Sequence, residues 1–293
     1  MLQRITALLV LTLFSTAGWA QLNVVATTTN MAMLAKTVGG EHVQVTTLAP
    51  PDRDAHHLSV RPNMMAALRS ADIVVSVGAE LEIGWLPPAI EGAGNRSIFP
   101  GREGYFEAAN QVELIGQVED ADRSMGDVHP RGNPHIYFDP RRLARAGLAL
   151  AEALAELDRD HAEAFRSGAR AFRDRVEQRL PEWRERVADA PGMLLFHQDA
   201  DYLAQLMDVS IHGYLEPVPG TPPTGRHLNR LVGELGDRDG VVIRQPWHSE
   251  RAVNFIHEQL GWPVRVLPSN VPVGGDADDY LELIDDWVQA LAD

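Results

Sequence analysis

Histidine is the residue type best suited to carry chemistry in this chain. The 293 residues include eleven histidines, no cysteine and a single lysine, Lys36. The absence of cysteine excludes disulfides, thiolate zinc sites, iron–sulfur clusters and thiol catalysis. A metal site or an acid–base site would therefore be built from imidazole nitrogens and carboxylates.

Several histidines lie where predicted strands end. His56 and His57 are in the loop after the second predicted strand, and His197 directly follows the apolar segment Met-Leu-Leu-Phe. His135 lies in a turn rich in Asn and Pro, just before a long predicted helix. Ligands of open α/β sheets collect beyond the carboxyl ends of the strands, so these positions are candidates for a common site.

An acidic residue adds an oxygen donor to this set. Asp278 lies in the segment Asp-Ala-Asp-Asp-Tyr, just before the last predicted helix. Three imidazoles and one carboxylate supply the four donors that a tetrahedral Zn²⁺ site requires. His56 and His135 would come from the first half of the chain, and His197 and Asp278 from the second. Each position also has an ordinary interpretation, because loop histidines are commonly solvated and an acid before a helix is commonly its N-cap.

Short β-branched segments alternate with helical patterns, which predicts βαβ units and mostly parallel sheets. We expect strands at 23–28, 43–48, 73–77, 193–196, 209–215, 241–243 and 264–267. We expect helices at 31–38, 61–70, 199–207, 226–235, 250–260 and 279–291. The predicted fold class is α/β, with two lobes, each a mostly parallel sheet flanked by helices, joined by a long rigid helix.

The middle of the chain, residues 140–189, consists almost entirely of helix-forming residues. Asp139 suits an N-cap and Pro140 the first turn of a helix that runs to about Leu157. A second helix is expected over 158–189, and Pro181 should kink or split it. The expected domains are an N-terminal lobe at 21–157, a linker helix at 158–190 and a C-terminal lobe at 191–293.

The first twenty residues are typical of a cleavable signal peptide. Arg4 precedes an apolar run at 5–14, and Gly18-Trp19-Ala20 has the small-x-small pattern of a cleavage site. The run is too short to span ~30 Å of hydrocarbon. A bacterial lipoprotein would need a cysteine at the cleavage point. We therefore expect an exported protein that is free in the periplasm and is not a lipoprotein.

The composition excludes some classes of partner. Hydrophobic residues make up 45% of the chain and charged residues 23%, which is typical of a globular protein. The formal net charge of −15 argues against a nucleic-acid partner, which needs a positive surface.

Five segments carry a family resemblance. They are Asp54-Ala55-His56-His57-Leu58, the stretch Asn-Pro-His-Ile-Tyr-Phe-Asp-Pro at 133–140, Phe-His-Gln-Asp-Ala-Asp-Tyr at 196–202, Leu-Glu-Pro-Val-Pro-Gly at 215–220, and Asp278-Asp279-Tyr280. In this order they resemble motifs of the zinc- and manganese-binding solute-binding proteins of bacterial ABC transporters, the TroA-like group. The resemblance covers essentially the whole mature chain.

The resemblance implies the metal ligands His56, His135, His197 and Asp278. The first loop departs from the family pattern, with Ala, Leu and Ser where the family has Pro, an aromatic residue and Glu. His57 therefore stays an alternative to His56, and Asp279 an alternative to Asp278. A histidine rather than a glutamate as the third ligand favours zinc, in agreement with the preference of imidazole for Zn²⁺.

By this resemblance the protein is a periplasmic zinc-binding protein and not an enzyme. It would capture Zn²⁺ as its transported ligand in the cleft between the lobes and deliver it to an ABC-transporter permease. We expect a monomer, with a periplasmic metallochaperone as a further partner, and an affinity that falls as pH drops through the histidine range near ~6.5. The alternatives are manganese or another divalent metal, a metal-dependent hydrolase, or an adhesin. A fourth protein ligand would close the site and oppose the hydrolase.

Two further loop histidines are candidates for metal acquisition. His129 lies in the region 113–133, where zinc members of the family carry a longer insertion rich in His and acids, and it could act as a low-affinity scavenger. His227 opens a helix after the segment Pro-Pro-Thr-Gly and is a minor candidate for metal entry.

Overall fold

A computed structural model describes residues 21–118 and 126–293. The predicted signal peptide at 1–20 lies outside the described residues. Within the described ranges, no helix is both long enough and apolar enough to cross a membrane.

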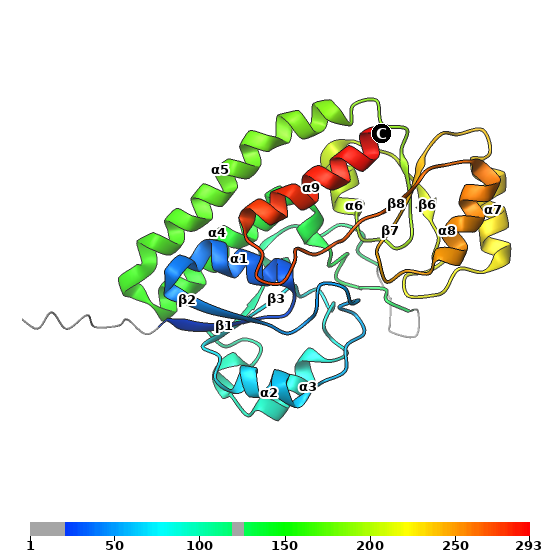
Figure 1. Cartoon of the computed structure of the whole chain (residues 1–293). Coiled ribbons are helices and arrows are strands. Elements are labelled where there is room, and N and C mark those ends of the chain that lie inside the picture. The colour runs from blue at the N-terminus through cyan, green and yellow to red at the C-terminus, as the bar shows by residue number, and fades with distance from the viewer. Residues whose placement is uncertain (1–20, 119–125) are drawn as a thin grey trace, which may run out of the picture.

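Two parallel sheets of four strands each form the framework of the molecule (Figure 1). The first sheet has the order β2-β1-β3-β4 and the second the order β6-β5-β7-β8, so both begin with the same crossover pattern. The strands are β1 Leu22–Ala26, β2 Val43–Thr47, β3 Ile73–Ser76, β4 Tyr105–Glu107, β5 Met193–Leu195, β6 Ile211–Tyr214, β7 Val241–Arg244 and β8 Val264–Val266.

Helices cover both faces of each sheet. They are α1 Thr29–Gly39, α2 Pro62–Arg69, α3 Leu86–Ala93, α4 Pro140–Leu157, α5 Ala162–Arg186, α6 Asp201–Met207, α7 Gly225–Leu235, α8 Glu250–Leu260 and α9 Ala277–Ala292. The central strands β3 and β7 are covered on both faces, and every one of their residues is buried. Their sequences are accordingly apolar except for the last residue, Ser76 in β3 and Arg244 in β7.

The outer face of each sheet has its own core. Helices α2 and α3 cover the first sheet with a cluster that includes Leu68 and Trp85, and α7 and α8 cover the second with a cluster that includes Leu231 and Trp262. The inner faces share one continuous core, which contains side chains of β1, β3, β5 and β7 together with α1, α4, α5, α6 and α9.

The last helix, α9, joins the two halves. It lies along the 25-residue helix α5 and also packs on α1, although the sequence places it after the second sheet (Figure 1). The Trp287 ring lies 4.7 Å from that of Phe138, and the Tyr280 hydroxyl donates to the Tyr137 carbonyl oxygen at 2.7 Å. The C-terminal helix therefore belongs as much to the first half of the molecule as to the second.

The structure confirms the α/β class with two parallel sheets. Asp139 caps α4 by accepting hydrogen bonds from two backbone amides of its first turn, and Pro140 is its first residue. Of the two expected effects of Pro181, a kink or a split, the split does not occur, because α5 continues through this residue. Pro181 is exposed, so the carbonyl that loses its partner faces water, while buried Val176 and Trp183 hold the helix on either side.

Two regular elements were not expected from the sequence, α3 and β4. Helix α3 begins with Leu-Pro-Pro, a pattern that is typical of loops but is also tolerated in a first helical turn. Strand β4 has only three residues and lies among glycines, so its sequence carries no periodic signal.

Candidate metal centre

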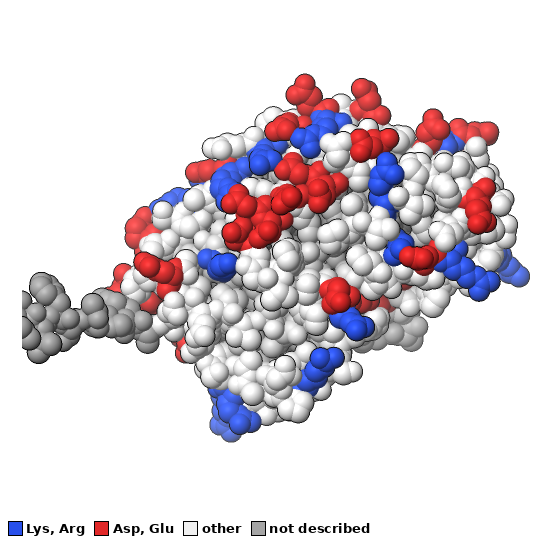
Figure 2. All heavy atoms as spheres, viewed as in Figure 1, with Lys and Arg blue, Asp and Glu red and all other residues white. Residues whose placement is uncertain are grey.

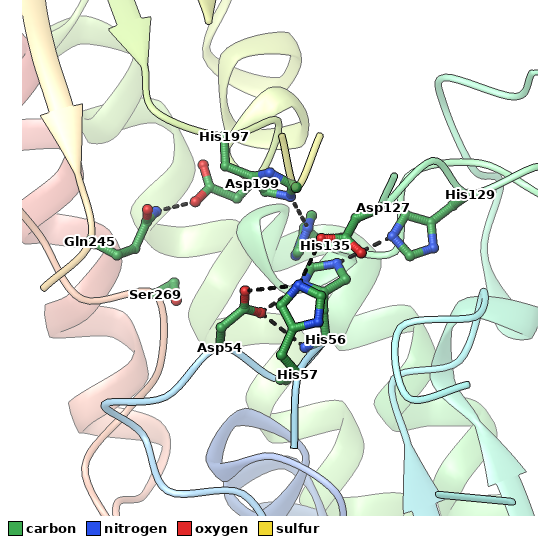
Figure 3. A network of polar contacts seen from close by, with 12 residues as sticks. Asp54, His56, His57, Asp127, His129, His135, His197, Asp199, Gln245 and Ser269 are labelled. Atoms are coloured by element: carbon green, nitrogen blue, oxygen red, sulfur yellow. Dashed lines mark hydrogen bonds and ion pairs between the residues drawn. The ribbon is translucent and has the colours of Figure 1, made fainter. Parts of the chain in front are cut away.

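Three of the four expected ligands meet between the two sheets. His56 follows β2, His135 precedes the short 3₁₀ turn that leads into α4, and His197 lies two residues after β5. One ring nitrogen of each lies within 4.8 Å of those of the other two (Figure 3). The Nε2 atoms of His135 and His197 are 3.2 Å apart. Strands of both sheets thus direct their following loops toward one point.

Local hydrogen bonds fix the backbone at two of these histidines. The side chain of Asp54 accepts from the His56 amide at 2.9 Å, and that of Asn133 accepts from the His135 amide at 2.9 Å. An Asx residue two positions earlier is a common way to turn a chain tightly. The sequence pattern Asx-x-His therefore positions the ring in each loop.

Each of the three imidazoles is also held through its Nδ1 atom. His56 Nδ1 lies 2.7 Å from Asp54 Oδ1, His135 Nδ1 lies 2.8 Å from the Tyr137 hydroxyl, and His197 Nδ1 lies 2.7 Å from Glu216 Oε2. Metal-binding histidines usually have such a partner on the second nitrogen, which fixes the tautomer and the ring orientation. The partners leave Nε2 of all three rings available for a ligand.

Burial and neighbouring charges set the protonation of the cluster. Burial, together with the adjacent His56 and His197, lowers the pKa of His135 well below its usual value. Burial also opposes the charged form of His197, but the hydrogen bond to Glu216 and the nearby Asp199 raise its pKa to about 9. Burial therefore favours the neutral ring at His135, while the neighbouring acids favour the protonated ring at His197.

The cluster opens into a cavity of about 450 Å³ that both halves line. Trp247 and His248 follow β7, and Ser269 and Asn270 follow β8 on the same rim. The cavity is half open to the surface and has room for an ion and its access path.

Asp199 is a buried acid beside the cluster that the sequence analysis did not single out. Gln245 donates to its Oδ2, while its Oδ1 is buried without a hydrogen-bond partner. Burial raises the pKa of Asp199 to about 7. The only sign of this role in the sequence was that Asp199 lies two residues after His197. Acids two residues from a histidine are too common for this spacing to identify a site residue.

The structure does not bring Asp278, the fourth expected ligand, to the cluster. Its side chain is 85% exposed and pairs with Arg175 of α5. Figure 2 shows acidic side chains gathered over the face formed by α5 and α9, the helix whose first turn contains Asp278. The alternative, Asp279, accepts from the Asp276 amide in a capping box. Acidic residues are favoured in a first helical turn, and this structural role explains the motif.

The other histidines considered are placed as follows. His57 is 60% exposed and binds Asp127 through Nε2 at 3.0 Å, so His56 and not His57 belongs to the cluster. His227 binds the Tyr214 carbonyl oxygen at 2.8 Å. His129 is buried, and its Nε2 lies 3.2 Å from that of His56, which places it beside the cluster and not on the outer surface.

The family model for the periplasmic component A of zinc-uptake complexes matches residues 24–293. Manganese-binding lipoprotein MntA of Bacillus subtilis is 28% identical over 245 residues, which are 81% of this chain and 75% of MntA. High-affinity zinc uptake system protein ZnuA of Yersinia pestis is 23% identical over 224 residues, 71% of this chain and 70% of ZnuA.

Solved structures show the same fold. A crystal structure of ZnuA superposes with a TM-score of 0.78 at 21% identity and covers 93% of this chain and 98% of that one. The solute-binding protein FpvC of Pseudomonas aeruginosa with Mn²⁺ gives a TM-score of 0.76 at 20% identity, with 93% and 97% covered.

The fold and the family match agree. The chain has two parallel sheets, a long connecting helix and a histidine cluster between the sheets, and the family model matches nearly its whole length. The chain belongs to the family of periplasmic zinc-uptake components, which are metal-binding solute-binding proteins of ABC transporters and not enzymes.

Proposed function

We propose that this protein captures Zn²⁺ at His56, His135 and His197 and delivers it to the permease of an ABC transporter. The observation that carries the proposal is the arrangement of the three rings. Each is held at Nδ1 by its own partner, and their available nitrogens converge within 4.8 Å. A partner on Nδ1 of each ring orients its Nε2 atom toward the common point, which is the arrangement that metal-binding histidines use.

The donor set supports zinc. Imidazole is a good ligand for Zn²⁺, Cu²⁺ and Ni²⁺, whereas Mn²⁺ prefers carboxylate, carbonyl and water oxygens. The cluster offers three nitrogens, and the two acids in direct contact with it, Asp54 and Glu216, are bound to the Nδ1 atoms of His56 and His197. Manganese is the second candidate, since relatives named for manganese are as similar to this chain as those named for zinc.

Delivery would require the site to open, and hydrogen bonds between the two halves limit how far they can separate. Thr29 donates to the Val271 carbonyl oxygen at 2.7 Å, and Asn30 donates to the Ser269 carbonyl oxygen at 2.9 Å. These bonds tie the segment after β8 to α1 across the two halves, and α9 extends the tie. We infer small lobe tilts and loop rearrangements at the cavity rim when the protein docks on its permease.

The remaining expectations complete the proposal. The protein would act in the periplasm as a monomer, released from a signal peptide without a lipid anchor, and a periplasmic metallochaperone would be a second partner. The acidic face over α5 and α9 would act mainly as a solvated surface, since its field is screened within ~8 Å at physiological salt.

The test is metal analysis of protein purified without added metal, followed by competition among Zn²⁺, Mn²⁺ and Cu²⁺. We expect one zinc per chain and a preference for zinc over manganese. His197→Ala should weaken zinc binding by orders of magnitude because it removes one of three ligands. One manganese per chain in the purified protein, or an unchanged zinc titration of H197A, would contradict the proposal.

A further inference from the structure

We propose that His129 is the fourth protein ligand of this centre, so that the ion is held by four imidazoles from four separate segments. The inference rests on the proposed function, since it completes the same site. It replaces the oxygen donor expected at Asp278 by a nitrogen donor from the loop between β4 and α4.

Two of the distances between ring nitrogens match edges of a tetrahedral zinc site. Zinc–nitrogen bonds of ~2.0–2.1 Å place two ligand atoms of a tetrahedral site ~3.3 Å apart. The Nε2 atoms of His135 and His197 are 3.2 Å apart, and those of His56 and His129 are also 3.2 Å apart. These pairs correspond to two opposite edges of one tetrahedron. His56 joins them, with its ring centroid 5.2 Å from that of His135 and 5.4 Å from that of His197.

His129 also faces the same space as the other ligands. Only 9% of its surface is exposed, and it lines a cavity of about 280 Å³ together with His135 and His197. Figure 3 shows the ring beside that of His56. In this structure His129 lies outside the group of three that all approach within 4.8 Å, so binding of the ion would have to bring His129 closer to His135 and His197.

The loop that carries His129 is attached to the second half of the molecule. The Asp127 amide donates to the Pro219 carbonyl oxygen at 2.9 Å, and the Asp127 carboxylate binds His57. Gly220 has a left-handed φ of 75°, and a β-carbon there would collide with the Asp127 carboxylate. The close approach of the two segments therefore depends on glycine at this position.

The same segment, residues 216–220, also holds His197. Glu216 Oε2 accepts from the Gly220 amide at 2.9 Å and binds His197 Nδ1 at 2.7 Å. Pro219 in between holds the His129 loop. One short segment thus supports two of the four rings, and its displacement would loosen both ligands together.

A site with four imidazoles has a consequence for selectivity. Replacing an oxygen donor by a nitrogen donor favours Zn²⁺ over Mn²⁺. Loss of His129 should accordingly weaken zinc binding far more than manganese binding. A His129 that merely packs the loop through its hydrogen bond to His56 would affect both metals alike.

The experiment compares wild type with His129→Ala, His129→Gln and His129→Asp, and uses His227→Ala as a control that removes a loop histidine outside the cavity. Zinc and manganese affinities are measured by chelator competition, and Co²⁺ is used as a spectroscopic probe because its visible absorption reports tetrahedral nitrogen ligation. Circular dichroism checks that each variant is folded, and H129Q keeps a polar side chain where alanine could collapse the loop.

We expect H129A and H129Q to lower zinc affinity by at least the roughly 10–100-fold that loss of an outer-shell partner costs, and to change the Co²⁺ spectrum. H129D should recover part of the zinc affinity with a shift toward manganese, and H227A should match wild type. An unchanged Co²⁺ spectrum in H129A, or an equal loss of zinc and manganese binding, would overturn the inference while leaving the three-histidine site intact. A wild-type protein that binds no zinc would instead overturn the proposed function itself.

Discussion

Replacing Glu216 by glutamine should separate the charge beside His197 from the hydrogen bonds that hold its ring. Glu216 Oε2 accepts from both His197 Nδ1 and the Gly220 amide. Because both bonds go to one oxygen, the amide oxygen of a glutamine can replace it with the geometry kept. Glu216→Gln therefore removes the negative charge alone, whereas Glu216→Ala removes the charge and both bonds.

The magnitude follows from the protonation of His197. Burial lowers its pKa, but Glu216 and Asp199 reverse that effect and bring it to about 9. Zinc must displace this proton, so wild-type affinity should rise nearly ten-fold per pH unit as pH approaches 9 from 7, and should level off above pH 9 at about 100-fold over its value at pH 7. E216Q should reach its plateau at a lower pH. Above pH 9 its affinity should be ~10–100-fold weaker than that of wild type, since the charge no longer supports the ligand.

The assay is competition with a chromophoric zinc chelator from pH 6.5 to 9.5, with calorimetry in buffers of different ionisation enthalpy to count released protons. We expect about one proton released per zinc at pH 7 in wild type and fewer in E216Q. A wild-type affinity that is flat between pH 7 and 9 would refute the reasoning, as would an E216Q profile with the same slope as wild type.

Three further predictions concern residues away from the ring nitrogens. Asp278→Asn should leave zinc affinity unchanged in chelator competition, because the carboxylate is exposed and paired with Arg175; a loss of ten-fold or more would return Asp278 to the site. Tyr280→Phe leaves the buried Tyr137 carbonyl without its donor and should lower the free energy of unfolding by ~1–3 kcal/mol in urea titrations, and no change would mean that the tie between α9 and the first half is weak. Metal-free protein should keep its far-UV circular dichroism after chelator treatment because its cores are built of apolar side chains, and a coil spectrum would contradict this.

The sequence predicted the parts of this structure that depend on local pattern. The alternation of β-branched strands with helices predicted two parallel sheets, and the strand-end positions of His56 and His197 predicted that they approach each other. His135 was predicted from a motif and a turn, and it lies in the same cluster.

What the sequence did not predict depends on contacts between distant segments. The role of Asp278 could not be read locally, because the pattern that resembles a ligand motif is also a capping box, and only packing decides which one operates. His129 reaches the cluster through a contact between two loops that are far apart in the sequence, Asp127 with Pro219, and neither loop carries a periodic signal for it. The path of α5 through Pro181 depends in the same way on which face of the helix meets water.

The placement of α9 has a consequence for the order in which the molecule can assemble. A ribosome releases the amino end first, yet the parts of α1 and α5 that pack on α9 stay uncovered until this 16-residue helix is made. The earlier half must therefore wait, with Phe138 and Phe172 unshielded, while the later sheet is made. The nascent chain would therefore expose this apolar surface while the second sheet is being synthesised. During that time a chaperone or a secretion channel could bind the chain and keep it unfolded.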